Sequence, residues 1–159
     1  MLFENRFIIK KIIKQKNLDF KNIRHRYYMS VKSCAYKNEK IDGKLYLAHE
    51  KDYEFLAPLI LKFYREEFEK KGLQTRNDVL LNFKHSIFQK HVYYWKGKER
   101  ITTLISIMEI PNNKIYIQNI YTVPEFRDKK ISKTALRFLF TELFNSGKIE
   151  IGLNVKTSN

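Results

Sequence analysis

The 159-residue sequence is poor in cysteine, glycine and proline, and it has no long apolar run. With a single cysteine, Cys34, the chain cannot form an intrachain disulfide, which favours a reducing compartment and predicts a cytoplasmic protein. No apolar stretch approaches the roughly 20 residues of a membrane-spanning helix. The apolar residues near the N-terminus are interrupted by lysines, unlike those of a secretory signal. The histidines lack the spacing of metal ligands, so no metal is predicted. They are His25, His49, His85 and His91.

Acidic residues are scarce relative to basic ones: 17 Asp and Glu stand against 31 Lys and Arg, which gives a net charge of +14. Residues 1–44 alone hold 12 basic and 4 acidic residues. Such an excess favours polyanionic partners, among them nucleic acids and the phosphates of coenzymes. No stripe of basic and aromatic residues lies on one predicted helix face. Charges spread over solvated surfaces are therefore the simpler interpretation, and nucleic-acid binding is not favoured.

Hydrophobic residues make up 43% of the sequence and aromatic residues 14%, which predicts a packed core rather than a disordered chain. The length suits one domain. A polar, turn-rich connector ends at Asp42–Gly43, so we predict a domain at residues 44–159 and an N-terminal basic extension at residues 1–43. Residues 1–16 have the spacing of a basic amphipathic helix packed on the body of the protein, with a membrane-surface helix as the alternative. Residues 17–44 alternate only weakly.

One stretch, residues 113–145, has the clearest pattern. Apolar and polar residues alternate up to Pro124, which predicts a strand that ends there. A basic turn, Arg127–Lys130, follows, and apolar residues then recur at helical spacing until Gly147. A strand that leads through a tight, positive turn into a helix presents backbone N–H groups and the positive end of the helix dipole. Together these groups suit a phosphate.

Similar patterns predict a strand, two helices, three antiparallel strands, a helix and a last strand, in that order. Asp52 is the expected N-cap of the first helix. The predicted ranges are a strand at 44–48, helices at 52–70 and 77–90, strands at 91–95, 101–110 and 113–123, a helix that ends near residue 145, and a strand at 150–155.

The run Asn119–Leu136, NIYTVPEFRDKKISKTAL, resembles the central motif of the GCN5-related N-acetyltransferase (GNAT) superfamily, R/Q-x-x-G-x-G/A. The order of elements from Lys44 onward is also similar to that fold, so the resemblance covers residues 44–159. It implies an α/β fold with a mixed, mostly antiparallel sheet flanked by helices. It also implies an acetyl-CoA-dependent N-acetyltransferase that moves the acetyl group directly to a primary amine, without a covalent enzyme intermediate.

The resemblance further implies which residues hold acetyl-CoA. Main-chain groups at the strand end would bind the pantetheine and acetyl arm, and a strand N–H would polarise the thioester carbonyl. Backbone N–H groups of the turn would wrap the pyrophosphate, with Lys129 or Lys130 adding charge. The implied cofactor-binding residues are Tyr121, Thr122, Val123, Arg127, Asp128, Lys129, Lys130, Ile131 and Ser132.

The sequence departs from the family pattern in two ways. Asp128 and Lys130 stand where the motif has glycine, which lets the backbone approach the phosphates closely, and Asp128 adds a negative charge there. The chain ends at Asn159, where family members continue with a helix and two strands that commonly supply the tyrosine that protonates the leaving thiolate. The implied domain is therefore C-terminally incomplete and its activity impaired. A fragment, a decayed copy and one half of an assembly are the alternatives.

The early end of the chain also predicts an exposed edge. In the family fold the last strand here, residues 149–155, would have its neighbour in the missing segment. A hydrophobic strand edge with unpaired backbone groups tends to recruit another chain, so a homodimer through this edge, aggregation or a loosely held C-terminus is expected.

No catalytic residue can be assigned from the sequence. Glu66, Glu67 and Glu69 lie near the end of the first predicted helix, where this fold receives the amine, and Glu109 lies at the end of a strand. Each is a candidate general base, but a solvated, charge-rich helix end is the favoured explanation of the three helix residues, and the base stays unassigned. The alternative function is a non-catalytic basic module that binds nucleic acid or a protein partner.

Overall fold

The computed structural model describes residues 26–34, 41–68, 74–98 and 100–156. Contacts divide the chain into two units, and one of them is Tyr28–Asn154. The other unit consists of the two chain ends, of which only residues 26–27 and 155–156 are described. The helix predicted at residues 1–16 lies outside the described residues. The site below belongs entirely to the unit Tyr28–Asn154.

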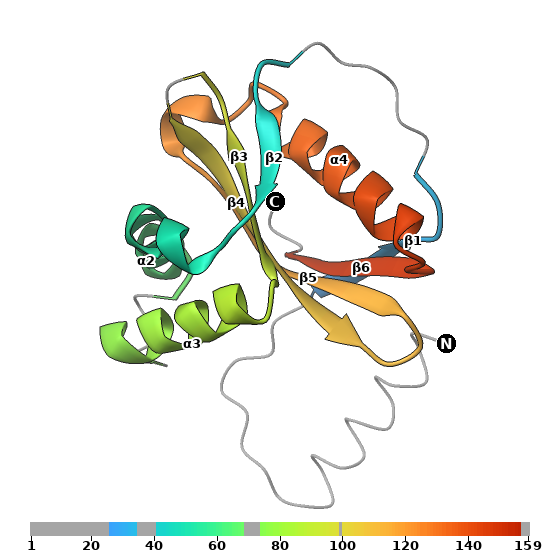
Figure 1. Ribbon diagram of the computed structural model, residues 1–159, viewed down its shortest axis with the longest axis horizontal. Helices are drawn as coiled ribbons and strands as arrows, with labels where there is room; N and C mark the ends of the chain where they lie inside the picture. The colour runs from blue at the N-terminus through green and yellow to red at the C-terminus, as the bar shows by residue number, and fades with distance from the viewer. Residues whose placement is uncertain (1–25, 35–40, 69–73, 99, 157–159) are drawn as a thin grey trace, which may run out of the picture. The chain divides into compact units, whose positions relative to one another are not determined.

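A six-stranded sheet runs through the fold in the order β1-β6-β5-β4-β3-β2 (Figure 1). The strands are β1 Arg26–Val31, β2 Lys44–Leu47, β3 Val92–Lys96, β4 Ile101–Ile110, β5 Lys114–Thr122 and β6 Glu150–Lys156. The pairs β2–β3, β3–β4 and β4–β5 are antiparallel, whereas β5 and β6 are parallel. The predicted mixed, mostly antiparallel sheet is therefore confirmed.

Helices cover both faces of this sheet (Figure 1). The helices α2 Tyr53–Phe68 and α3 Arg76–Phe88 pack on one face, and α4 Ile131–Asn145 packs on the other. In β4, Leu104 belongs to the core under α2 and α3, while Ile105 belongs to the core under α4. This explains why β4 is buried along most of its length rather than at alternate residues. Among the described residues, no helix is both long enough and apolar enough to cross a membrane.

Two short-range caps set where the helices on the first face begin. Thr75 caps α3: its Oγ1 accepts from the Asp78 N–H, and the Asp78 carboxylate accepts from the Thr75 N–H at 2.9 Å. Asp52 is not the N-cap of the long helix, contrary to the prediction. It ends a 3₁₀ turn, η1 Glu50–Asp52, and its carboxylate accepts from the His49 N–H. The turn leads directly into α2. The Asp52 carboxylate therefore caps the start of the 3₁₀ turn, at His49, and not the start of α2.

The edge predicted to be open is covered. β1 lies beside β6 in the sheet, and Tyr28 of β1 lies so close over Gly152 that a Cβ at Gly152 would meet the tyrosine ring. Ser30 of β1 hydrogen-bonds to the Glu150 carboxylate and helps to lower its pKa, after the larger effect of Lys114. Part of the predicted basic extension is thus a strand of the same sheet. The expected dimer through β6 loses its structural basis.

Candidate functional site

The strands β5 and β6 part at the middle of the sheet. Their parallel register runs from Lys114–Glu150 to Ile117–Leu153, while β5 continues to Thr122 without a β6 partner. At the same point β5 has an irregularity against β4: Ser106 faces Asn119, but the next residue of β4 faces Ile117. One residue of β5, Gln118, is therefore extra, as in a β-bulge, which bends a strand and ends regular pairing. The result is a wedge beside the second half of β5.

A tight turn joins the open end of β5 to the N-terminus of α4. After a 3₁₀ turn, η3 Pro124–Phe126, the chain takes the left-handed conformation twice, with φ of 62° at Asp128 and 59° at Lys130. Lys130 is the N-cap of α4 and makes no side-chain capping bond, and its carbonyl accepts the Thr134 N–H at 3.0 Å. The first N–H groups of a helix have no acceptor within it. The start of α4 is thus a place where an anion finds donors and a favourable dipole.

A cavity of about 420 Å³, here called the turn cavity, brings most of the predicted binding residues together. Its predicted members are Tyr121, Thr122, Arg127, Asp128, Lys130, Ile131 and Ser132. Phe63, Glu66 and Glu67 of α2 form the facing wall. The turn, the end of β5 and the start of α4 therefore line one cavity.

Arg127 fastens the turn to α2 rather than projecting freely into the cavity. Its Nη2 donates to Glu66 Oε2 at 2.7 Å, and its Nε donates to the Thr122 carbonyl at 3.0 Å. The guanidinium carbon also lies 5.7 Å from the centre of the Tyr121 ring. Three groups of the protein thus contact the guanidinium of a residue that lines the cavity.

Tyr121 completes this cluster from β5. Its hydroxyl donates to Glu66 Oε1 at 3.2 Å, and its ring meets Phe63 edge-on. Burial, followed by the negative charge of Glu66, raises the pKa of the Tyr121 phenol, so the side chain keeps its proton at neutral pH. Glu66 therefore accepts hydrogen bonds from a neutral tyrosine and a charged arginine at once.

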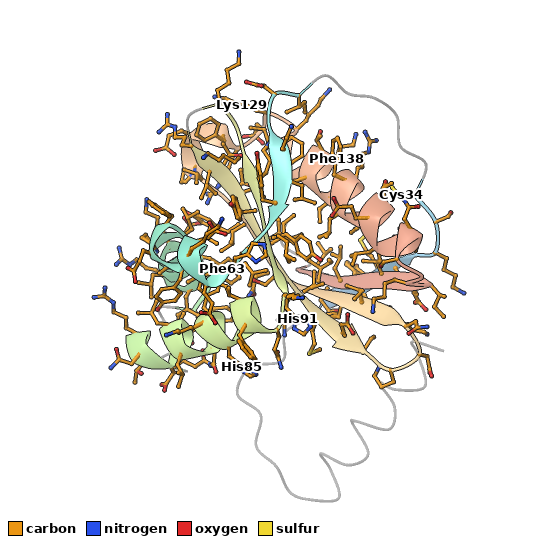
Figure 2. The ribbon with its side chains drawn as sticks, viewed as in Figure 1. Cys34, Phe63, His85, His91, Lys129 and Phe138 are labelled. Carbon is orange, nitrogen blue, oxygen red and sulfur yellow. The ribbon has the colours of Figure 1, made fainter. Side chains whose placement is uncertain are left out.

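Two predicted residues lie elsewhere. Val123 is buried in the core under α2 and α3, and its N–H donates to the Thr102 carbonyl at 2.9 Å. Lys129 does not line the turn cavity; its Nζ lies 5.2 Å from the centre of the Phe126 ring. It lines a neighbouring cavity of about 550 Å³ together with Arg100. Figure 2 shows Lys129 in the turn, away from Phe63 of α2.

The candidate bases have different surroundings. Glu66 and Glu67 line the turn cavity, and Glu69 lies outside the described residues. Glu109 accepts from Lys148 Nζ at 2.9 Å and lies at the far end of β4, so it is not part of this site. Within the described part of the chain, no three His, Cys, Asp or Glu side chains come together as metal ligands.

Two features of the site escaped sequence reasoning. The Glu66–Arg127 contact joins residues 61 positions apart, and no local pattern marks it. The bulge at Gln118 could have been suspected, because the apolar alternation of β5 is interrupted by consecutive polar residues at Gln118 and Asn119.

Comparison with known proteins agrees with this geometry. The model of the acetyltransferase (GNAT) family matches residues 53–159. Similar solved structures include the PaiA N-acetyltransferase from Thermoplasma acidophilum in complex with coenzyme A, with 17% identity, a TM-score of 0.60, and 75% of this chain and 82% of that chain covered. A GCN5-related N-acetyltransferase from Sphaerobacter thermophilus has 12% identity and a TM-score of 0.68, with 94% of this chain and 47% of that chain covered.

The ribosomal-protein-alanine N-acetyltransferase from Brucella melitensis is similar at 15% identity and a TM-score of 0.58, with 72% of this chain and 81% of that chain covered. At such identities the structures show the fold alone. No curated protein matches the sequence.

Proposed function

The chain belongs to the acetyltransferase (GNAT) family, and from this premise we propose that it transfers the acetyl group of acetyl-CoA directly to a primary amine in the cytoplasm. The observation that carries the proposal is the left-handed turn at Asp128 and Lys130, which opens α4 beside the free end of β5. It combines a phosphate site with a strand edge able to bind an extended arm.

The pyrophosphate would lie at the start of α4. The N–H groups of Ile131 and Ser132 belong to the first turn of this 15-residue helix, and both residues line the turn cavity. Lys130 lies on the same wall and adds positive charge. On the other side of Phe126, Lys129 and Arg100 line the neighbouring cavity and extend the positive field for the remaining phosphate of the coenzyme.

The pantetheine arm would run in the wedge between β5 and β6. Beyond Ile117 the backbone of β5 is no longer in register with β6, so its groups face the wedge. An N–H in this part of β5 would stabilise the negative charge that develops on the thioester oxygen. Glu66 and Arg127 would act as positioning residues, because their contact holds the turn against α2.

The reaction itself needs few protein groups. The lone pair of the amine nitrogen forms the new C–N bond to the thioester carbonyl carbon, and the C–S bond then breaks with its electrons remaining on sulfur. The proton lost by nitrogen balances the thiolate, which leaves as the free thiol of CoA. Holding the two reactants together supplies a large part of the acceleration.

Melting measurements with CoA test the proposal. At 100 times the Kd, a ligand stabilises the native state by about 2.7 kcal/mol, which corresponds to a rise in Tm of about 5–10 °C for a protein of this size. Inorganic phosphate and a short RNA serve as comparison ligands. A shift with RNA but not with CoA would favour the basic-module alternative, and no shift with CoA at millimolar concentration would refute the proposal.

A further inference from the structure

A second cavity, here called the bulge cavity, lies between α2, α3, β4 and β5 and has a volume of about 450 Å³. Phe63 of α2, which is labelled in Figure 2, lines both this cavity and the turn cavity according to their lining residues. On β5, Asn119 lines the bulge cavity and the next residue, Ile120, lines the turn cavity. A molecule in the bulge cavity would therefore be a direct neighbour of a coenzyme arm that lies along β5.

The floor of the bulge cavity contains a buried hydroxyl without a partner. Ser106 is only 2% exposed, and among the described residues its Oγ has no hydrogen-bond partner. The neighbouring buried hydroxyls of β4 differ: Thr102 Oγ1 donates to the Trp95 carbonyl, and Thr103 Oγ1 bonds with Thr122 Oγ1. Buried polar groups nearly always have partners, and those that do not require an explanation.

The position of Ser106 in the sheet makes the missing partner more notable. On the face under α2 and α3, the preceding residue of β4 is Leu104, which is fully buried core. Ser106 takes the next place on that face and pairs across the sheet with Asn119, directly at the bulge. An apolar side chain would be expected in a core position of this kind. The sequence instead places a hydroxyl and an amide side by side where the helices leave a cavity.

The described residues that line the cavity are aromatic, aliphatic or polar without charge. The rings belong to Phe63, Tyr64, Phe68 and Phe83. The polar groups belong to Gln74, Asn82, Ser86, Ser106, Gln118 and Asn119. Among the lining residues that the structure describes, no side chain carries a charge. Aromatic rings with a few convergent amide and hydroxyl groups are typical of a small-molecule site that hydrogen-bonds neutral polar groups of its ligand.

We infer that the bulge cavity is the acceptor site and that it selects a primary amine bearing neutral hydroxyl or amide groups, which Ser106 and Asn119 recognise. This inference rests on the proposed acetyl transfer. A hydroxyl or amide of the acceptor would satisfy the buried Ser106 Oγ, and an acceptor without such a group would leave it unpaired. Sites built to hydrogen-bond a substrate group discriminate strongly against analogues that lack it.

The uncharged lining also suits the chemistry of the amine. Burial away from opposite charge disfavours an ammonium ion and lowers the pKa of the amine. The acceptor would then enter as the free base, which is the form that attacks the thioester. A dicationic amine would have to leave its second charge in a cavity that offers it no carboxylate among the described lining residues.

The test compares amines that differ in their neutral polar groups. D-glucosamine and cyclohexylamine share a six-membered ring but differ in hydroxyls; L-alaninamide supplies an amide, and putrescine supplies a second charge. Binding of each probe to the full chain is measured by saturation-transfer NMR, with and without CoA, and acetylation by release of the CoA thiol. CoA binding is measured separately by calorimetry, so that loss of coenzyme binding, which would contradict the proposed function, is distinguished from a wrong acceptor class.

We expect glucosamine or alaninamide to be bound and acetylated at least about 10-fold better than cyclohexylamine and putrescine. Ser106→Ala should lower kcat/KM for the favoured probe about 3- to 10-fold, the factor that one neutral hydrogen bond is worth. It should leave CoA affinity unchanged and should not lower the melting temperature, because the buried hydroxyl has no partner in the free protein and its removal relieves an unsatisfied polar group. Ser146→Ala, whose hydroxyl bonds to the Leu143 carbonyl in α4, is the matched control and should not change the selectivity.

Three results would overturn the inference while leaving the proposed function intact. The first is equal or better use of cyclohexylamine or putrescine. The second is absence of binding by both polar probes to a protein that binds CoA. The third is a selectivity that Ser106→Ala and Ser146→Ala leave equally unchanged.

Discussion

Replacing Lys130 with glycine measures what the left-handed turn costs the protein. Lys130 has a φ of 59°, a conformation that costs a residue with a Cβ about 1–2 kcal/mol and glycine almost nothing. Glycine also loses more backbone entropy on folding, and this cost offsets about 0.5–1 kcal/mol of the relieved strain. Lys130→Gly should therefore stabilise the fold by about 0.5–1 kcal/mol, which corresponds to a rise in Tm of about 1–4 °C.

The same substitution tests how closely the backbone approaches the coenzyme. Lys130→Gly removes both the charge and the Cβ from the wall of the turn cavity, whereas Lys130→Ala removes the charge but keeps the Cβ and the strained φ. If the backbone N–H groups at the start of α4 bind the pyrophosphate, the glycine variant should bind CoA several-fold more tightly than the alanine variant. Calorimetry with CoA measures both affinities.

Lys90 provides a matched control on the opposite face of the sheet. It follows α3 with a φ of 60°, and its N–H donates to the Ile87 carbonyl, so it has the same strain without lining the turn cavity. Lys90→Gly should raise Tm by a similar amount and leave CoA affinity unchanged. A fall in Tm for Lys130→Gly, or equal CoA affinity in its glycine and alanine variants, would refute the reasoning.

Three further predictions concern contacts that fix the site and its supports. Arg127→Ala should weaken CoA binding roughly 10-fold. It should cost little stability, because the exposed pair with Glu66 contributes at most about 1 kcal/mol to folding. If Glu66→Gln and Arg127→Ala lose CoA affinity equally, only the ion pair matters for binding. Gly152→Ala should displace the Tyr28 ring and speed amide exchange in β1, because the added Cβ meets that ring. The double variant with Tyr28→Ala should restore slow exchange; continued fast exchange would show that the two residues are not coupled. Hydrogen bonds from the hydroxyl and the backbone N–H of Thr75, the N-cap of α3, lower the pKa of Asp78, so its stabilising contribution is present at neutral pH and lost as pH falls through the lowered pKa; Asp78→Asn should flatten the acid limb of stability measured by urea melts.

Local signals made the strand–turn–helix of residues 114–145 predictable. Alternation, the stop at Pro124 and the change to helical spacing each depend on neighbours a few residues apart, and β5 and α4 lie where these signals predict them. The cap of α3 was not predicted, although Thr75 and Asp78 have the spacing of a capping box. The cap at Asp52 was misplaced because one carboxylate can serve a 3₁₀ turn or the α-helix that follows it.

Long-range contacts could not be predicted from the same signals. β1 joins β6 through residues more than 100 positions apart, and its own alternation is too weak to indicate a partner. The extent of each cavity, the contact of Glu66 with Arg127 and the missing partner of Ser106 are properties of packed side chains. They depend on which faces meet, and a single sequence does not contain that information in any local pattern.

Asp128 and Lys130, which replace the glycines of the family motif, adopt the backbone conformation that glycine favours. Residues held in disfavoured conformations persist only where surrounding contacts determine them, and such strain is typical of functional sites. Here the contacts exist on both sides: Arg127 is held by Glu66 and the Thr122 carbonyl, and the Lys130 carbonyl accepts the Thr134 N–H of α4. The anchors therefore maintain a turn that its own residues disfavour, and at the proposed phosphate site the missing glycines would change how closely a phosphate can approach.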